Sequence, residues 1–393
     1  METINILYNI VAVVFAALIA FTLTPPTRVL AFKIGAVDVP LDNRRMHTKP
    51  IPRIGGLAIF LSFWISTMLF CSLTPELASI WVGGGILVIL GVLDDIYRLK
   101  PGLKFVVQLL AAVFAVVNGC VIDHINIGGE YIMLGVFSYP LTLLWIVGLT
   151  NAINFIDGLD GLACGVSLIS SISLFCVLLL QGDSEFAVIT AILAGACLGF
   201  LPFNSNPARI FMGDTGALFL GYALAVISVQ GVFKLHAVLS FIAPLMVFAF
   251  PILDTFFAIF RRLLAGKSPF APDRGHLHHR LVDMGFTQKE SVNILYAICG
   301  ILGLVAVFCT ESMFANGRAI RSFCVAGIAL LIFLVNFVVM KNPDTRKHSG
   351  LTEDDVTVEE YLRIKEAERA KRIAKKQESG KNDAVTEQND EKE

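Results

Sequence analysis

Long apolar stretches, separated by short polar segments, run through the first 340 residues of the chain. A helix that crosses a lipid bilayer needs about 20 predominantly apolar residues. By this criterion the sequence predicts about eleven membrane-spanning helices, of which the third and the fifth are short. The predicted ranges are 4–24, 54–73, 79–93, 104–122, 139–153, 162–181, 186–203, 213–231, 236–260, 291–310 and 321–340. The predicted fold class is therefore an all-α polytopic membrane protein.

Composition agrees with this prediction. Hydrophobic residues make up 55% of the chain and charged residues only 16%, whereas soluble domains are roughly 25% charged. Of the 31 basic and 32 acidic residues, 26 lie in the last 53 positions. We therefore expect a transmembrane domain over 1–340 and a charged, partly disordered tail over 341–393. Within the first region, alternating stretches around Gly128-Gly129 predict a small hairpin over 123–138.

The distribution of Lys and Arg predicts the orientation, because cytoplasmic loops carry an excess of basic residues. One set of loops is basic, whereas the opposite set holds only Lys234, Arg318 and Arg321. The basic set comprises Arg28, Lys33, Arg44, Arg45, Lys49, Arg53, Arg98, Lys100, Lys104, Arg209, Arg261, Arg262, Lys267, Arg274, Arg280 and Lys289. With eleven spans, the N-terminus lies outside and the tail lies in the cytoplasm.

Five polar segments fall on the predicted cytoplasmic side of the membrane. They are 46–56, 94–104, 151–161, 211–216 and 273–280. Each segment has an ordinary explanation on its own. Together they predict one site assembled at the inner membrane surface.

The adjacent acids Asp94 and Asp95 end an apolar run, and Lys100 and Lys104 follow them. Neighbouring carboxylates repel each other unless a cation or a hydrogen-bond donor is near. A solvated helix end would explain the pair alone. Acids beside amines also suit a phosphate-handling site, in which the acids hold metal or activate a nucleophile and Lys neutralises phosphate.

Amide and carboxylate side chains recur at every third residue, at Asn151, Asn154, Asp157 and Asp160. On a helix this spacing places them along one slowly drifting face. A polar seam between helices would explain them. A set of oxygen donors also suits a hard cation such as Mg²⁺, and Gly158 and Gly161 would let a ligand approach the backbone closely.

Two further acids are candidates for function, one before a predicted span and one within a predicted span. Asp214 precedes a predicted span, so it is either a helix cap or, with the nearby Arg209, part of a phosphate site. Asp254 lies within the ninth predicted span, where an acid is either functional or structurally paired. Pro244 and Pro251 should kink that span and open an apolar groove for a lipid chain.

A histidine-rich segment carries His276, His278, His279 and Arg280 directly after Arg274. A zinc site would need a fourth ligand, and no Cys lies in these loops. A solvated basic loop is one alternative. Histidines flanked by arginines better suit an anionic diphosphate or an acid–base role.

The order of these motifs resembles the polyprenyl-phosphate N-acetylhexosamine-1-phosphate transferases, also called glycosyltransferase family 4, over about residues 25–340. The segment 268–281 is most similar to the bacterial undecaprenyl-phosphate N-acetylglucosaminyl 1-phosphate transferases. Muramoyl-pentapeptide translocases typically carry three consecutive His there, whereas Leu277 interrupts the run in this chain.

The resemblance implies a role for each matching position. Asp94 and Asp95 match paired catalytic acids, and Asp157 matches an acid of the nucleotide site. Lys104 matches a Lys that meets phosphate, and Lys100 stays unassigned. The implied Mg²⁺ ligands are Asn154 and Asp214, with Mn²⁺ as a substitute ion. The implied uracil pocket includes Asp160 and Phe211, and the implied sugar and diphosphate site comprises Arg274, His276, His278, His279 and Arg280.

The resemblance implies a function for the whole chain. Such an enzyme transfers N-acetylhexosamine 1-phosphate, here most simply GlcNAc 1-phosphate, from a UDP-sugar to a polyprenyl phosphate and releases UMP. This step starts a cell-envelope polysaccharide, with the active site at the cytoplasmic face of the cell membrane. We expect no nucleic-acid partner, and a homodimer is one option. The alternatives are a phospho-N-acetylmuramoyl-pentapeptide transferase, a lipid or ion transporter, and a non-catalytic scaffold.

Overall fold

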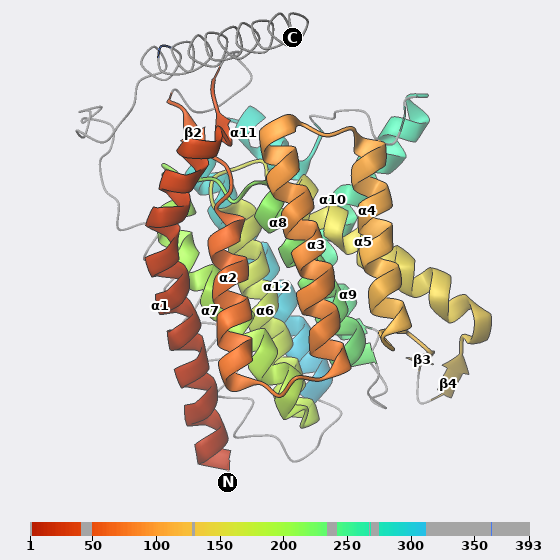
Figure 1. The fold of residues 1–393 in the computed structure, drawn as a ribbon. Helices are drawn as coiled ribbons and strands as arrows, with labels where there is room; N and C mark the ends of the chain where they lie inside the picture. The colour runs from red at the N-terminus through yellow and green to blue at the C-terminus, as the bar shows by residue number, and fades with distance from the viewer. Residues whose placement is uncertain are drawn as a thin grey trace, which may run out of the picture. The chain divides into compact units, whose positions relative to one another are not determined.

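The computed structural model describes residues 2–40, 49–127, 130–233, 242–266, 268, 275–311 and 363. The chain forms two units. One comprises residues 37–51 and 344–393; its described part includes β1 (Val37–Asp38), which pairs with β2 (Ile51–Pro52). The other comprises residues 1–36 and 52–343, and everything below concerns this unit, a helical bundle (Figure 1).

The bundle consists of helices of very different lengths. They are α1 (Glu2–Ile34), α2 (Gly56–Phe70), α3 (Pro75–Tyr97), α4 (Pro101–Val117), α5 (Ser138–Phe155), α6 (Leu162–Gln181), α7 (Ser184–Asn204), α8 (Gly213–Ile227), α9 (Ile242–Val247), α10 (Ala249–Leu264), α11 (Leu277–Asp283) and α12 (Gln288–Glu311). Among the described residues, seven helices are long and apolar enough to cross a membrane. The prediction of an all-helical polytopic membrane protein is confirmed, whereas the number eleven and the orientation of the termini stay predictions.

The lengths of the predicted spans need correction. The third and fifth ranges, predicted to be short, lie in long helical segments: α3 has 23 residues and Gly135–Phe155 has 21. The short helices are instead α2, with 15 residues, and α4, with 17. Helix α3 extends beyond its apolar stretch at both ends. Thr74 caps its first turn, and the carboxylates of Asp94 and Asp95 near its other end are hydrogen-bonded.

The ninth predicted range, 236–260, contains a break. Its described part forms α9 and α10, which are separated at Phe248. Pro251 has no N–H to bond the carbonyl of Val247, so the predicted interruption by proline is confirmed at this point. The first part of the range, the eleventh range and the tail lie outside the described residues, except Arg363.

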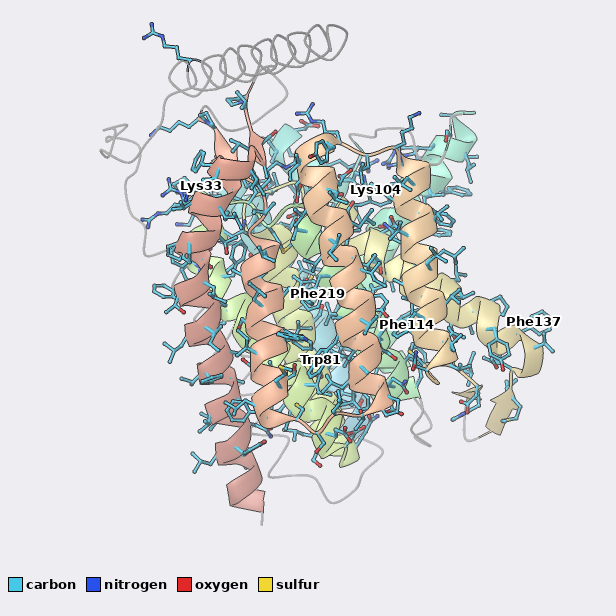
Figure 2. All side chains as sticks on the ribbon, in the orientation of Figure 1. Lys33, Trp81, Lys104, Phe114, Phe137 and Phe219 are labelled. Carbon is cyan, nitrogen blue, oxygen red and sulfur yellow. The ribbon has the colours of Figure 1, made fainter. Side chains whose placement is uncertain are left out.

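The predicted hairpin is present. Strand β3 (His124–Ile127) pairs antiparallel with β4 (Glu130–Met133), with His124 opposite Met133 and Ile127 opposite Glu130. It precedes a 3₁₀ turn, η1 (Gly135–Phe137), that leads into α5. Lys33 of α1 and Lys104 of α4 lie at one end of the bundle, and Phe137 beside the hairpin lies towards the other end (Figure 2).

The core centres on α8, which continues into a π-helix, η2 (Ser228–Phe233). Every residue from Thr215 to Ile227 is buried. Phe219 packs edge-on against Phe60 and Phe63 of α2, with ring centroids 5.2 and 5.5 Å apart. Helices α3 and α5 also pack against α8. Because α8 is enclosed on all sides, the position of its N-terminus is set by its neighbours, and this N-terminus carries Asp214.

Candidate active site

Helix α3 ends and helix α4 begins at the same end of the bundle (Figure 1). Polar side chains from these two helices and from the start of α8 contact one another there. Asp95 is the most deeply placed of them, with a side chain that is 0% exposed. Its carboxylate accepts hydrogen bonds from the Asp214 N–H at 3.2 Å, the Thr215 N–H at 3.2 Å and the Thr215 hydroxyl at 2.8 Å. Arg53 Nη2 lies 3.4 Å from Asp95 Oδ1. A carboxylate from α3 therefore caps the N-terminus of α8, where free N–H groups favour negative charge.

Two alternatives considered from the sequence are therefore wrong. A buried, fully bonded Asp95 is not part of a solvated helix end. Asp214 is not the cap of α8 either, because the helix begins at Gly213 and Asp95 supplies the capping carboxylate. The side chain of Asp214 contacts Lys104 instead.

Glycines allow the backbones to meet at this point. The glycine at position 213 has φ +70° and sits against the Arg53 carbonyl and the Asp95 carboxylate. Gly56 packs on the Gly216 backbone and Gly91 on the Thr215 backbone. The Phe211 N–H donates to the Pro52 carbonyl at 2.8 Å, and the Phe211 carbonyl accepts from Gly55 N–H at 2.9 Å. The predicted segments 46–56 and 211–216 thus join through their main chains, and Phe211 is held at this junction.

Lys104 joins two carboxylates. Its Nζ lies 3.1 Å from Asp94 Oδ2 and also donates a hydrogen bond to Asp214 Oδ2. The second oxygen of Asp94 accepts from the Leu99 N–H at 2.8 Å. The side chain of Lys104 is 20% exposed, and those of Asp94 and Asp214 are 13% and 15% exposed. The three groups predicted to handle phosphate and metal are therefore in direct contact and still reach solvent.

Asp157 lies close to this cluster, just beyond the end of α5. The pKa of its carboxyl group is raised to about 8, chiefly by burial and in addition by the carboxylates of Asp214 and Asp95, whereas Arg53 opposes the shift. Asp157 therefore carries a proton at neutral pH. Burial is the main cause of the shift and the neighbouring carboxylates add to it, so a cation bound nearby would lower this pKa.

The helical-face prediction for 151–161 is wrong in part. Helix α5 ends at Phe155, so Asp157 and Asp160 follow it in a turn rather than along its face. Asn151 forms an interhelical bond, from its Nδ2 to Gln108 Oε1 of α4 at 2.6 Å, as the polar-seam alternative proposed. The half-buried Asn154 lies in the last turn of α5.

Asp160 fastens the connection between α7 and α8. Its Oδ2 accepts from Asn206 Nδ2 at 2.9 Å and from the Ala208 N–H at 3.0 Å. Asn206 also donates to Gln288 Oε1 of α12 at 2.9 Å. Asp160 is thus already engaged with protein groups, and its predicted contact with uracil stays a prediction.

The two glycines of this turn accept protein side chains. His278 from α11 occupies the space beside Gly158, and Tyr296 from α12 occupies the space beside Gly161 and Gly165. The Tyr296 hydroxyl donates to the Gly161 carbonyl at 2.6 Å. The close approach predicted for a ligand is therefore made, at these glycines, by the protein itself.

The histidine segment begins α11 and is held from α10. His276 Nδ1 lies 2.8 Å from Asp254 Oδ2, and Asp254 Oδ1 accepts from the Leu277 N–H at 2.8 Å. His276 and His278 stack at 5.6 Å, and the His278 and His279 rings lie 4.3 Å apart. The solvated-loop alternative is wrong for His276 and His278, which are buried, whereas His279 is half-buried and Arg280 is exposed. Arg274 lies outside the described residues.

His278 differs from its neighbours. Both of its ring nitrogens are buried, and neither has a hydrogen-bond partner in the described part of the chain. The pKa of His278 is lowered to about 3, chiefly by burial and in addition by the nearby His279 and His276. The ring is therefore neutral at physiological pH, so it is no cation for a diphosphate in this state.

Some residues of the site were not among the candidates from the sequence. Arg53 pairs with Asp95, Thr215 bonds the same carboxylate, and Asn206 links Asp160 to α12. Arg262 lies over the Phe155 ring at 5.7 Å. The basic character of Arg53 and Arg262 was visible in the sequence, but no local signal distinguished them from other loop arginines.

No group of three or more His, Cys, Asp or Glu side chains within the described ranges is arranged to enclose a metal ion. The zinc alternative therefore has no support among these residues. Mg²⁺ commonly binds through one or two protein carboxylates, several waters and substrate phosphates. The oxygen donors Asn154 and Asp214, beside an excess of carboxylates, fit that kind of site.

Comparison with known proteins defines the class. Residues 77–232, which run from α3 to the π-helix, match the family described as Glycosyl transferase family 4. Together with the relatives below, this match shows that the chain belongs to that family. The resemblance inferred from the motifs is confirmed.

The relatives are named after one reaction. A "Probable undecaprenyl-phosphate N-acetylglucosaminyl 1-phosphate transferase" of Bacillus subtilis (strain 168) is 42% identical over 303 residues, or 76% of this chain and 84% of that protein. A decaprenyl-phosphate N-acetylglucosaminephosphotransferase of Mycobacterium tuberculosis (strain ATCC 25618 / H37Rv) is 37% identical over 358 residues, or 81% and 87%. An undecaprenyl-phosphate alpha-N-acetylglucosaminyl 1-phosphate transferase of Escherichia coli O157:H7 is 28% identical over 323 residues, or 79% and 84%.

Proposed function

We propose that this protein transfers GlcNAc 1-phosphate from UDP-GlcNAc to a polyprenyl phosphate, with undecaprenyl phosphate as the expected acceptor, and releases UMP. The observation that carries the proposal is the contact of Lys104 with Asp94 and Asp214 at one end of a membrane-embedded bundle. A lipid phosphate at headgroup level and a soluble nucleotide can both reach such a position. The names of the relatives give the same sugar and a polyprenyl phosphate acceptor, which is undecaprenyl phosphate in one and decaprenyl phosphate in the other.

The proposed reaction is a phosphoryl transfer. An oxygen of the lipid phosphate attacks the β-phosphorus of the donor, and the bond from this phosphorus to the bridging oxygen breaks. The electron pair of that bond leaves with UMP. Lys104 and Arg53 offset the charge of the phosphates, and Asp94 accepts the proton of a lipid phosphate that enters singly protonated.

Mg²⁺ is the proposed metal, with Mn²⁺ as a substitute, and Asn154 and Asp214 are its proposed protein ligands. A bound divalent ion would draw charge from the diphosphate oxygens. Lys104, which contacts the Asp214 carboxylate, would offset charge on the phosphates beside that ion. Asp157, next to Asp214 and Asp95, is expected to lose its proton when a cation arrives.

The remaining assignments concern the donor. Asp160 and Phe211 are proposed to hold the uracil, Phe211 by ring stacking. The loop with Arg274, His276, His278, His279 and Arg280 is proposed to contact the sugar and diphosphate. Because His278 is neutral and buried, its contribution is packing against Gly158 rather than charge.

We further propose that the site faces the cytoplasm of the cell membrane and that the product starts a cell-envelope polysaccharide. Basic side chains such as Lys33 and Lys104 lie at the same end of the bundle as the acidic cluster (Figure 2), which supports this orientation. The charged tail over 341–393 and a homodimer are predictions that stand beside this proposal.

The experiment is nucleotide exchange in detergent. Because one diphosphate bond replaces another, the reaction should run in both directions, and labelled UMP should enter the UDP-GlcNAc pool when polyprenyl phosphate is present. Chelation with EDTA should abolish this exchange, and Mg²⁺ or Mn²⁺ should restore it.

Three outcomes contradict the proposal. Release of UDP in place of UMP would show that the sugar–oxygen bond breaks instead. Preference for UDP-N-acetylmuramoyl-pentapeptide as donor would support a translocase-type enzyme. Movement of lipid or ions without any UMP release would support the transporter alternative.

A further inference from the structure

We propose that Asp254 of α10 is a positioning residue, which fixes His276 and the start of α11 so that the histidine segment recognises the sugar–diphosphate part of the donor. The inference rests on the proposed function and adds to it a residue outside the acidic cluster. Asp254 and His276 come from segments 22 residues apart. Both side chains are almost fully buried, at 6% and 7% exposure.

Asp254 uses both of its oxygens. Oδ1 accepts from the Leu277 N–H, and Oδ2 faces His276 Nδ1, each at 2.8 Å. The first bond satisfies one of the free N–H groups at the start of α11, for which His276 provides no side-chain cap. One carboxylate therefore sets both where α11 begins and how its first histidine is turned.

The second bond selects a tautomer. A carboxylate accepts only, so in the neutral ring Nδ1 carries the proton and Nε2 carries the lone pair. Nε2 can then accept a hydrogen bond from a sugar hydroxyl or an acetamido N–H. The same arrangement orients histidines in metal sites and catalytic triads, where the second partner matters almost as much as the first.

The neighbours connect this pair with the rest of the site. The His276 ring lies 6.1 Å from the Phe155 ring in the last turn of α5, which also carries Asn154. His278, the second residue of α11, packs against Gly158, next to Asp157. Arg261 of α10 fills the space beside Gly275, immediately before α11. Helix α10 therefore contacts the histidine segment through both Asp254 and Arg261. A displacement of α11 would move His276 and His278, which pack against residues of the proposed donor site.

The test is Asp254→Asn in the full-length protein, assayed by UMP release. An amide at 254 can still accept from Leu277, but its NH₂ group opposes His276 Nδ1 and favours the other tautomer. We expect the KM for UDP-GlcNAc to rise about tenfold or more, the KM for polyprenyl phosphate to stay unchanged, and the preference for UDP-GlcNAc over UDP-GalNAc to weaken. Asp183→Asn is the matched control, because Asp183 caps α7 through the Phe186 N–H and is remote from the site.

A second variant keeps the test decisive if Asp254→Asn does not fold. His276→Asn retains a donor towards Asp254 and so preserves the start of α11, but it removes Nε2. It should raise the KM for UDP-GlcNAc, and adding Asp254→Asn to it should have little further effect, because both changes act on one interaction.

The outcomes separate the two proposals. An unchanged KM and sugar preference in folded Asp254→Asn, or fully independent effects in the double variant, would overturn the positioning role. An equal loss for both substrates would reduce Asp254 to a structural cap. Absence of UMP release by the wild-type protein would instead refute the proposed function.

Discussion

Asp94 and Asp95 show how far neighbouring residues can differ in role. Asp95 is enclosed and binds the N-terminus of α8, whereas Asp94 faces Lys104 and remains partly exposed. One step along a helix turns a side chain by about 100°, so the two carboxylates point to different neighbours. Asp94 is therefore the member of the pair that substrate can reach.

Lys104 provides a prediction at this scale. Lys104→Met leaves Asp94 and Asp214 side by side without their shared cation and removes a phosphate contact. We expect UMP exchange to fall by about 100-fold or more, measured on protein that still elutes as a single species in detergent. Lys100→Met is the control, because Lys100 is exposed at the start of α4 and makes no side-chain contact with the cluster; similar losses in both variants would remove Lys104 from the site.

Asp157 predicts a dependence of stability on pH. Its carboxyl group keeps a proton up to about pH 8 in the folded protein but loses it near pH 4 when unfolded. Between these values the folded state binds more protons, so the free energy of unfolding falls as pH rises. Asp157→Asn removes this effect. Between pH 6 and pH 8.5, without divalent cations, the melting temperature of the wild type should decrease relative to the variant by several degrees, which corresponds to about 2.5 kcal/mol; parallel curves would contradict the raised pKa.

At the scale of elements, the site depends on how closely α3 approaches α8. Gly91 lies against the Thr215 backbone, and Thr215 N–H is bonded to Asp95. A side chain at 91 would push the two helices apart at the point where Asp214 enters the site. Gly91 therefore allows α3 and α8 to pack closely, and this packing in turn fixes the position of Asp214 in the site.

Gly91→Ala should therefore destabilise the protein by about 1–3 kcal/mol, a typical effect of overpacking, and should lower exchange activity as Asp214 moves. Gly85→Ala in the same helix is the matched control. A methyl group there would find only Phe60 at an ordinary 3.7 Å, so thermal stability in detergent should stay within about 1 kcal/mol of the wild type. Equal stability of both variants would show that the α3–α8 contact tolerates extra volume.

At the scale of the whole molecule, the acidic cluster and the hairpin lie towards different ends of the bundle. Helix α11 lies at the end with the acidic cluster, and the hairpin of β3 and β4 lies towards the opposite end (Figure 1). If the proposed orientation holds, the first end faces the cytoplasm and the second faces outwards. This arrangement would bring the soluble nucleotide and the lipid phosphate to the same side.

Single cysteines in a Cys-depleted variant test the orientation. Met284→Cys follows α11 at an exposed position, and Asp123→Cys precedes the hairpin at a side chain that is 56% exposed. A membrane-impermeant maleimide should label only position 123 in intact cells, and position 284 only after the inner surface is opened. The reverse pattern would invert the proposed topology and remove the site from the cytoplasm.

The sequence by itself determined the elements. Apolar stretches predicted most of the long helices that the structure describes, though not their exact lengths and not α11, since a helix in a bilayer satisfies its backbone hydrogen bonds within one segment and needs no distant partner. The hairpin and the break near Pro251 followed from equally local signals. The order of the polar motifs was sufficient to identify the family.

Only the tertiary structure decided what each polar residue contacts. Asp95 caps a helix that begins more than a hundred residues later, and Asp160 fastens a connection rather than lying on a helical face. Gly158 makes room for His278, and Asp254 holds His276. Spacing along the chain cannot reveal such partners, because they depend on which ends of packed helices meet. Composition and periodicity describe one helix at a time, whereas the burial and the charge of a side chain are set by its neighbours in space.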